Sequence, residues 1–536
     1  MKRLILPAVA VLMVILMGAV VWRSAFALTG EESLAGQVRG VVQVGYNVFR
    51  PPLDLDPYAE IEHAAVSPYG INTFLHLEVE EAKREQALQM ASEAGFDWIR
   101  QEFVWEDIEI DGPGDFTDRR NDLDGDGVPD PISAWAKYDN IVELAGQYDI
   151  QILARLDNPP SWSRSQPDAV IGSTAPPDDY DDFARFAAAV AERYEGQITY
   201  FQVWNEPNIY PEWGEQVVSP EDYTDLLCRA YAAIKAVNPE AVVLTGALAP
   251  TAELSGRDFN DFLFLQRMYD AGAADCFDVL SVQGYGLWSG PTDQRLRPII
   301  VNYGRNQFIR DIMVRNGDAE KAIWISEMNW NIAPEDVEPR YGRVSVEQQA
   351  RWAPLAYQRA QEDWPWVGMV AFWYLKRADD QWLVERRPEA YFQMLEPDFT
   401  PLPVYETMAQ AANQPPVMYP GSHPPDHWAI DYAVEPVTFT FSGTHLAVHY
   451  AAREAGTCGL VVRAADGPAR IGEDCPGTVT WQGPPGEHTV QFELVGSAAI
   501  DRIIVRDQLR IPPLPFFGVL GVLLFAAVVL YPHKTS

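Results

Sequence analysis

The interpretation of this chain turns on the stretch ITYFQVWNEPN at residues 198–208. Its first six residues form an apolar, β-rich run, and the rest is polar loop that carries a single carboxylate, Glu206. A carboxylate that leaves a buried strand beside a Trp and an Asn is positioned to act on a molecule outside the core. The stretch therefore predicts a strand that ends in a functional group.

A second stretch of this kind is AIWISEMNW at residues 322–330, where another apolar run ends in a single carboxylate, Glu327, flanked by aromatic residues. Cleavage of a glycosidic bond needs two carboxyl groups, because the leaving oxygen must be protonated and the developing positive charge needs an anion beneath it. The two strand-end glutamates therefore indicate chemistry on a glycosidic bond.

Strand-like and helix-like runs alternate on both sides of these stretches, which is the pattern of successive β-α units in a parallel sheet. Amphipathic helices are expected at 179–194 and from Ser219-Pro220 onward, where a capping hydroxyl precedes a first-turn proline. The expected strands are residues 70–75, 98–102, 151–156, 198–203, 242–246, 279–283, 322–326 and 369–373.

Eight β-α units in series predict an α/β fold of the (β/α)8 TIM barrel type, in which functional groups gather at the C-terminal ends of the strands. Glu206 ends the fourth expected strand and Glu327 ends the seventh. The alternative is a doubly wound open sheet, but no G-x-G-x-x-G motif follows the first strand. We expect this catalytic domain to occupy residues 28–413.

Composition excludes several classes of partner. The chain has 40 basic and 76 acidic side chains and a net charge of -36, which argues against binding to nucleic acid or to anionic lipid headgroups. Aromatic residues make up 12% of the chain and include 17 Trp, and such rings suit the faces of sugars although most serve in packing. No obligate protein partner is evident.

The four cysteines are too few for a disulfide scaffold. Cys458 and Cys475 lie close in sequence and are expected to pair if their region is extracytoplasmic, whereas Cys228 and Cys276 are expected to be buried thiols. No Cys/His cluster has zinc spacing, so a transition-metal site has no support.

Both ends of the chain are predicted to meet a membrane. Residues 1–27 combine Lys2-Arg3, an apolar run at 4–22 and small residues at Ala25 and Ala27, which fits either a cleaved signal peptide or an N-terminal membrane anchor. Residues 511–531 are uncharged and apolar and predict a C-terminal transmembrane helix, with a buried core helix as the alternative. We therefore expect an extracytoplasmic protein tethered at the cell surface.

Residues 417–508 have a different sequence pattern. After a Pro-rich linker at 414–416, short runs of alternating apolar and polar residues are separated by Gly and Pro turns. This pattern predicts an all-β sandwich, either a carbohydrate-binding module or a spacer. The expected strands are 437–441, 446–450, 459–462, 488–494 and 500–505.

Over about residues 67–412 the chain resembles clan A glycoside hydrolases, the retaining (β/α)8 enzymes with an Asn-Glu-Pro motif on strand four and a nucleophilic Glu on strand seven. The motif WNEPN at 204–208 is most similar to family 39, with family 5 next. The resemblance implies Glu206 as acid/base and Glu327 as nucleophile. The substrate-binding residues that it implies are Asn205 at the sugar 2-hydroxyl, Arg100 and Tyr285 at the nucleophile, and Trp373 as the aromatic floor of the sugar subsite.

The chain departs from this pattern at Gln283, since many relatives carry a His two residues before the Tyr that corresponds to Tyr285.

In retaining enzymes the two carboxyl groups stand about 5 to 5.5 Å apart. Glu206 must stay protonated, which burial and the negative charge of Glu327 favour, whereas Glu327 must stay ionised, which Arg100 and Tyr285 favour.

Two further groups are candidates. The acidic run DLDGDGVPD at 122–130 places Asp122, Asp124, Asp126 and Asp130 around a Gly at the sixth position, as in a calcium loop. The twelfth position of such a loop, normally a Glu that binds through both oxygens, is Ser133 here. A solvated acidic turn is the alternative. Trp162 follows the third expected strand and is placed either on the cleft rim or in packing. Some of Trp105, Trp288 and Trp330 are expected to line subsites as well.

The sequence thus predicts a membrane-tethered retaining O-glycoside hydrolase that acts on oligo- or polysaccharides. It requires no organic cofactor, and a structural calcium ion is the only metal expected. A transglycosylase and a catalytically silent carbohydrate-binding protein are the alternatives.

Overall fold

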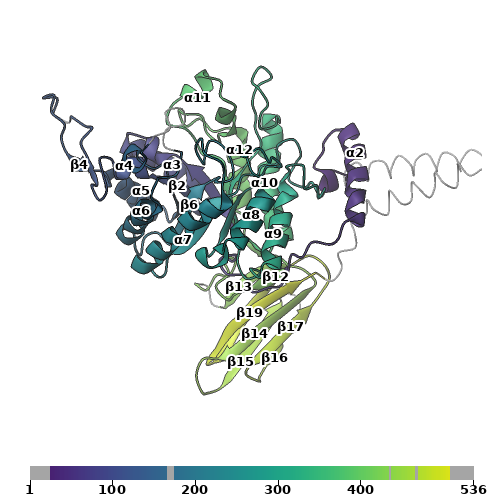
Figure 1. The fold of residues 1–536 in the computed structure, drawn as a ribbon. Coiled ribbons are helices and arrows are strands. Elements are labelled where there is room, and N and C mark those ends of the chain that lie inside the picture. The colour runs from purple at the N-terminus through teal and green to yellow at the C-terminus, as the bar shows by residue number, and fades with distance from the viewer. Residues whose placement is uncertain (1–24, 123, 166–173, 434–435, 465–468, 508–536) are drawn as a thin grey trace, which may run out of the picture.

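The computed structural model describes residues 25–122, 124–165, 174–433, 436–464 and 469–507. These residues form a barrel of strands and helices and, beside it, a smaller domain made only of strands (Figure 1). The sequence predicted this division into an α/β part followed by an all-β part.

The first part is built on an eight-stranded parallel sheet whose strand order is β7-β6-β5-β2-β1-β10-β9-β8. Parallel bridges join the two outer strands, Leu244 to Val279 and Leu248 to Val282, so that the sheet closes on itself. Every predicted strand is found within two residues of its expected bounds. The barrel strands are β1 (Tyr69–Thr73), β2 (Trp98–Val104), β5 (Gln151–Asp157), β6 (Tyr200–Asn205), β7 (Val242–Ala247), β8 (Leu280–Gln283), β9 (Ile323–Met328) and β10 (Val367–Phe372).

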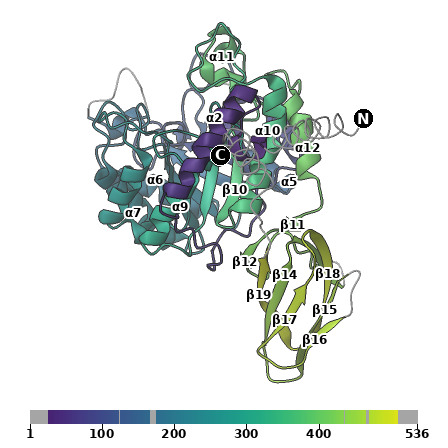
Figure 2. The same cartoon turned by 90° about the vertical axis from the view of Figure 1, so that its right-hand side faces the viewer.

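Helices cover the outside of this sheet (Figures 1 and 2). The two helices predicted in detail begin as expected: Asp179 caps α6 by accepting a hydrogen bond from the backbone N–H of Asp181, and Ser219 caps α7 by accepting one from Asp222. The helices are α2 (Leu34–Gly45), α3 (Glu81–Glu93), α4 (Trp105–Ile108), α5 (Ala136–Gln147), α6 (Tyr180–Arg193), α7 (Pro220–Val237), α8 (Asp261–Asp270), α9 (Asn306–Arg315), α10 (Val346–Asp363), α11 (Gln381–Val384) and α12 (Pro403–Ala412).

The interior of the barrel is layered. At the N-terminal ends of the strands the rings of Trp98, Tyr200 and Trp324 pack against one another with centroids 4.7–5.1 Å apart. The next layer is polar: the Gln202 amide donates to the hydroxyls of Ser281 at 2.8 Å and Ser326 at 3.3 Å. An apolar floor therefore lies beneath a hydrogen-bonded layer, which in turn supports the C-terminal mouth.

The second part consists of two sheets, with strand orders β11-β13-β18-β15-β16 and β12-β19-β14-β17. Phe439 and Val490 from the first sheet share one apolar core with Val448 and Ile503 from the second, which makes the domain a β-sandwich. Its strands are β11 (Val417–Met418), β12 (Gly421–His423), β13 (Val437–Ser442), β14 (His445–Ala452), β15 (Cys458–Ala464), β16 (Arg470–Gly472), β17 (Gly477–Gln482), β18 (Glu487–Gly496) and β19 (Ala498–Arg506).

Two disulfides are present. The expected pair Cys458–Cys475 is confirmed, with Cα atoms 6.0 Å apart. The prediction that Cys228 and Cys276 are thiols is wrong, because they form a disulfide with Cα atoms 4.8 Å apart. The two residues are 48 positions apart, and only the packing of α7 against the short turn at Ala273–Cys276 brings them together.

The predicted membrane segments at 1–27 and 511–531 lie almost entirely outside the described residues. Within the described part of the chain, none of the helices has the length and apolar character needed to span a bilayer. Residues 25–29, at the end of the N-terminal segment, are helical, and Ala25 is buried there.

Candidate active site

The mouth of the barrel begins with an unusual turn at the end of β6. Trp204 and Glu206 have positive φ angles of 75° and 41°, a backbone region that costs about 1–3 kcal/mol for residues other than glycine. The turn buries the Trp204 ring between Phe183 and Trp213. It also breaks the alternation of the strand, so that Asn205 and Glu206 follow one another at the barrel mouth.

Glu327, on β9, is held from both sides. The Arg100 guanidinium donates to its Oε1 at 2.8 Å, and the Tyr285 hydroxyl donates to its Oε2 at 2.7 Å. Arg100 is buried and also donates to Oδ1 of Asn205 at 2.8 Å. One guanidinium therefore links the end of β9 to the end of β6, which brings the two predicted glutamates to the same mouth.

The pKa of Glu206 lies well above its usual range, first because of burial and then because of the negative charges of Glu327 and Glu212. The Gln283 amide opposes this rise by donating to Glu206 Oε1 at 3.2 Å. Glu206 thus favours the protonated form, whereas Glu327 accepts two hydrogen bonds that stabilise a carboxylate. Burial and the charge of Glu327 also raise the pKa of Tyr285, which keeps its hydroxyl a donor.

Trp373 follows β10 directly and is half-buried beside the site. Its backbone N–H donates to the carbonyl of Met328 at 3.1 Å, and its own carbonyl accepts a hydrogen bond from Asn329. Its ring meets Phe74 edge to face at 5.4 Å. These bonds fix the residue next to the end of β9, where Glu327 lies.

Sequence reasoning missed part of the site. Gln283 was noted as a departure from the family pattern, but its hydrogen bond to Glu206 was not foreseen, and its Oε1 is buried without a hydrogen-bond partner among the described residues. No sequence signal marks Glu212, whose negative charge raises the pKa of Glu206. It lies in the loop after β6 and is not part of any sequence motif. Its effect on the pKa of Glu206 depends on how that loop folds back toward the end of the strand.

A second group of charges lies at the ends of β2 and β5. Glu102 stands 3.6 Å from the Arg155 guanidinium and 3.7 Å from the His76 ring. Burial lowers the pKa of His76 to about 3, so that its ring is neutral. Burial raises the pKa of Asp157 to about 6 and that of Glu212 to about 7. Arg155 forms ion pairs with Glu102 and Asp157, and its positive charge opposes the rise in the pKa of Glu212.

Of the other candidate tryptophans, Trp162 is half-buried and in contact with α4 and its C-terminal end. The Trp162 indole N–H donates to the carbonyl of Glu109 at 2.8 Å, and its ring packs edge to face on Trp105 at 5.6 Å. Trp105 and Trp330 are completely buried, so the expectation that they line subsites is not supported by their positions. Trp288 is the exposed member of the set.

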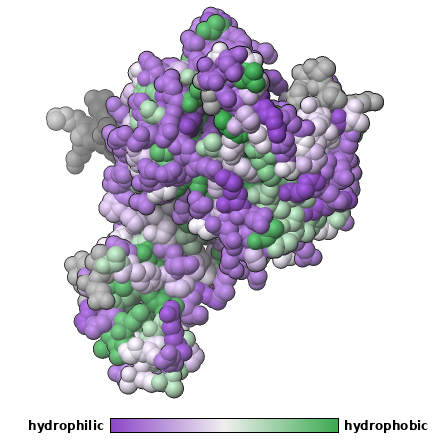
Figure 3. Space-filling model, turned by 90° about the vertical axis from the view of Figure 1, so that its left-hand side faces the viewer, coloured by the Kyte–Doolittle hydropathy of each residue, from purple (hydrophilic) through white to green (hydrophobic). Residues whose placement is uncertain are grey.

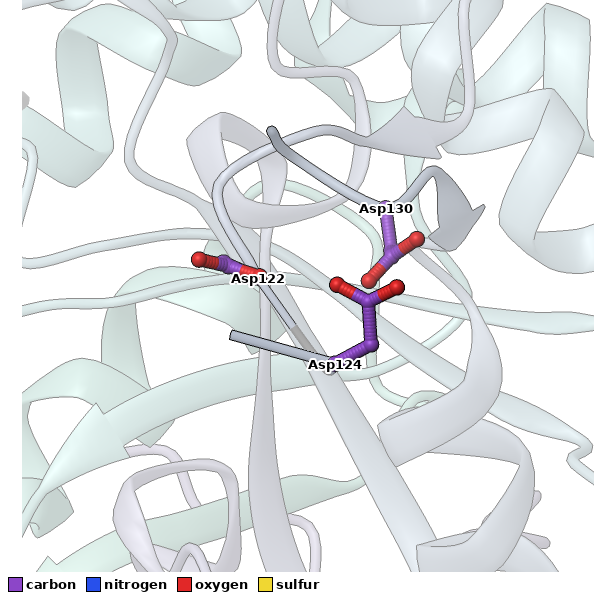
Figure 4. Close-up of side chains that lie close together, drawn as sticks. All are labelled: Asp122, Asp124 and Asp130. Carbon is purple, nitrogen blue, oxygen red and sulfur yellow. The ribbon is translucent and has the colours of Figure 1, made fainter. Parts of the chain in front are cut away.

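The acidic loop lies between β3 (Thr117–Asp118) and β4 (Ile132–Ser133), which form a hairpin that projects from the barrel (Figure 1). Asp122, Asp124 and Asp130 each place one carboxylate oxygen within 4.8 Å of the others, and Asp126 is not part of this group (Figure 4). Oxygen donors suit calcium, but Asp122 also accepts backbone hydrogen bonds from Gly125 and Gly127, as in a folded turn. Calcium at this loop stays a prediction.

Comparison with protein families gives one match: the family described as "Cellulase (glycosyl hydrolase family 5)" matches residues 59–261. The matched range contains β1 to β7 and Glu206 and ends before Glu327. The resemblance to clan A glycoside hydrolases is thereby confirmed, and it supports glycosidase activity. The search of curated proteins finds no match.

Several solved structures of glycoside hydrolases are similar to this chain at low identity. A family 39 glycoside hydrolase from the gut symbiont Bacteroides cellulosilyticus WH2 is 16% identical, with 81% of this chain and 83% of that chain covered and a TM-score of 0.47. A monomeric beta-xylosidase from Caulobacter crescentus CB15 is 14% identical, with 82% and 98% covered and a TM-score of 0.47. The exo-beta-1,4-mannosidase Op5Man5 from Opitutaceae bacterium strain TAV5 is 15% identical, with 68% and 64% covered and a TM-score of 0.45.

Proposed function

We propose that the protein is a retaining O-glycoside hydrolase in which Glu206 is the acid/base and Glu327 the nucleophile. The observation that carries the proposal is the contrast between the two carboxyl groups. Glu206 has a raised pKa, and Glu327 lies between the Arg100 guanidinium and the Tyr285 hydroxyl. Two carboxyl groups in such different environments can take different roles, one as the protonated acid and the other as the ionised nucleophile. The family 5 match over residues 59–261 supports the reaction class.

In the first step Glu327 bonds to the anomeric carbon while Glu206 gives its proton to the departing glycosidic oxygen. In the second step Glu206 takes a proton from water, the water oxygen bonds to the anomeric carbon, and the Glu327 carboxylate is released with both hydrogen-bond donors in place. Side-chain carboxyls supply all of this chemistry. Like the glycoside hydrolases of the matched family, the enzyme needs no cofactor.

The charges of the mouth favour a sugar that carries no carboxylate. Glu102 and Asp157 form ion pairs with Arg155, and the ring of His76 is neutral. A uronic acid bound there would place a further carboxylate beside the buried carboxyl groups of Asp157 and Glu212, which is unfavourable in a site of low dielectric constant. We therefore infer that the substrate is a neutral oligo- or polysaccharide, and that aryl uronides are not cleaved.

We also propose that the enzyme is tethered to a membrane outside the cytoplasm. Two disulfides support an oxidising compartment. The backbone of residues 26–30 bonds to the loop at 290–294 through pairs such as Gly290 with Gly30 and Gln294 with Leu28. Cleavage after Ala27 would leave these two bonds but would remove the bond that the Thr292 hydroxyl donates to the Phe26 carbonyl at 2.5 Å, so we favour an uncleaved anchor. The sandwich at 417–508 serves as an accessory domain or spacer.

Two alternatives remain. A transglycosylase shares every residue of the site and differs only in passing the sugar to another hydroxyl instead of water. A silent carbohydrate-binding protein would not need Glu206 and Glu327 in their contrasting environments.

The experiment is a screen of neutral aryl β-glycosides and polysaccharides with Glu327→Ala, Glu206→Ala and the control Glu320→Ala, an exposed residue just before β9. We expect Glu327→Ala to be inactive on every substrate and to be partly rescued by azide with inverted configuration. Glu206→Ala should lose most activity on substrates with poor leaving groups. Equal losses across leaving groups would contradict the role of Glu206, and an added sugar acceptor that captures the product would identify a transglycosylase.

A further inference from the structure

The helix α2 turns an apolar face to solvent. Leu34 is 59% exposed, Val38 61% and Val42 61%, and just beyond the helix Tyr46 is 67% and Phe49 85% exposed. Residues four apart lie on the same side of a helix, so the first four form one stripe. We call these five residues the α2 face. A soluble domain normally turns such a stripe toward its own core.

The opposite side of α2 is fixed to the barrel, so the α2 face cannot turn inward. A side chain at Gly40 would meet Thr29 at 2.7 Å, which shows how closely the helix approaches the preceding segment. The Gln43 amide oxygen accepts a hydrogen bond from Arg295 at 3.0 Å, and the Asn47 amide donates to the carbonyl of Gln294 at 2.7 Å. Figure 2 shows α2 lying across the outside of the barrel.

The charge of this segment is opposite to that of the rest of the chain. Residues 34–50 contain Arg39 and Arg50 and no acidic residue, although the whole chain carries a net charge of -36. The side of the molecule that faces away from α2 is mostly hydrophilic, with apolar residues scattered among polar ones (Figure 3). An apolar stripe accompanied by basic residues is typical of a helix that lies in the plane of a membrane surface.

The position of α2 along the chain identifies the surface that covers it. The predicted apolar run at 4–22 ends 12 residues before Leu34. The described residues before α2 begin at Ala25 and are packed on the barrel, since the Phe26 ring lies 6.3 Å from that of Trp352. At the other end of the described chain, the Arg506 guanidinium lies 4.9 Å from the ring centre of Tyr58, in the segment that follows α2. The described chain therefore begins beside α2, where Thr29 meets Gly40, and its last strand, β19, ends beside the segment that follows α2.

We propose that α2 is an interfacial helix whose exposed apolar face lies in the surface of the bilayer that the terminal segments enter. The inference rests on the proposed membrane tether and adds to it a second, lateral contact. The tether alone would let the barrel rotate above the membrane, whereas burial of the α2 face to a depth of about 5–10 Å would hold it in one orientation.

The test uses the full chain in phosphatidylcholine nanodiscs and a polarity-sensitive fluorophore on a single introduced cysteine. All four native cysteines are in disulfides, so the introduced thiol is the only one that reacts. Val38→Cys and Val42→Cys report on the α2 face. Val217→Cys is the matched control, because Val217 is 73% exposed and precedes α7, on the other side of the barrel from α2.

We expect labels at 38 and 42 to emit at shorter wavelength than the label at 217 and to be quenched by lipids that carry a spin label on the acyl chain, while the label at 217 is not quenched. Equal emission and no quenching at all three positions would overturn the proposal. Shifted emission without lipid quenching would also overturn it, because protein would then cover the face, either residues 4–22 and 511–531 or a second copy. Failure of the protein to enter nanodiscs at all would refute the tether itself.

Discussion

The hydrogen bond from Tyr285 to Glu327 gives the sharpest test of the catalytic proposal. Tyr285→Phe removes one donor from Glu327 Oε2 at 2.7 Å and leaves the Arg100 bond to Oε1 in place. A hydrogen bond to a charged group contributes about 1.5–3 kcal/mol. If all of this free energy stabilises Glu327 as it departs from the anomeric carbon, losing the bond slows hydrolysis of the glycosyl-enzyme intermediate by about 10- to 150-fold.

The loss should fall on the second chemical step. Without the phenol, Glu327 still attacks the anomeric carbon, but the departing carboxylate has one hydrogen-bond donor fewer and leaves more slowly. With an aryl glycoside whose aryl group departs easily, kcat should drop and a pre-steady-state burst of the released phenol should appear. Steady-state and stopped-flow measurements on the same substrate distinguish this result from a general loss of activity.

Tyr269→Phe is the matched control, because the Tyr269 hydroxyl also donates to a carboxylate, Asp318, at 2.9 Å, but on the helical layer outside the barrel. It should leave kcat unchanged. An unchanged kcat in Tyr285→Phe, or an equal loss in both variants, would show that the phenol does not act on the nucleophile.

Three further predictions follow from the charges, disulfides and acidic loop. Glu212→Gln removes a negative charge that helps to raise the pKa of Glu206, so the pKa of Glu206 should fall. The alkaline limb of the kcat/KM profile should then move to lower pH, whereas the control Glu215→Gln, an exposed residue on the same loop, should leave it in place. Replacing both residues of the Cys228–Cys276 pair by serine should lower the free energy of unfolding by about 4 kcal/mol, compared with about 3 kcal/mol for Cys458–Cys475, because the first disulfide closes the longer loop. Denaturant titration of both variants measures the two losses, and a larger loss for Cys458–Cys475 would contradict the prediction. If the acidic loop binds calcium, added Ca²⁺ should raise the Tm of the wild type and not that of Asp124→Asn, and equal Tm values in both proteins would leave the loop as an exposed turn.

The barrel strands were predictable because strands buried on both faces are continuous apolar runs, and because Gly, Pro and polar loops mark their ends. Glu206 and Glu327 could be singled out for the same reason, since each is the carboxylate at the end of such a run. Arg100, Asn205, Tyr285 and Trp373 came from the family resemblance, and the structure brings all four to the same mouth.

What the sequence did not provide are contacts made by loops and by distant segments. The positive φ angles at Trp204 and Glu206 have no sequence signature, because neither residue is Gly or Asn. The Cys228–Cys276 disulfide depends on the packing of two segments far apart in sequence. Trp105 and Trp330 follow strands, as residues of a cleft do, but their rings turn into the core, and only the packing decides between these positions.

The ring floor made by Trp98, Tyr200 and Trp324 also limits how a long substrate can move. A cavity of about 980 Å³ separates the barrel from the sandwich, and Trp98 and Tyr200 line it from the barrel side. The packed rings lie between this cavity and the catalytic mouth, so the two are not joined along the barrel axis. On the proposed function, a substrate therefore reaches Glu206 and Glu327 from the C-terminal ends of the barrel strands and not through the barrel axis.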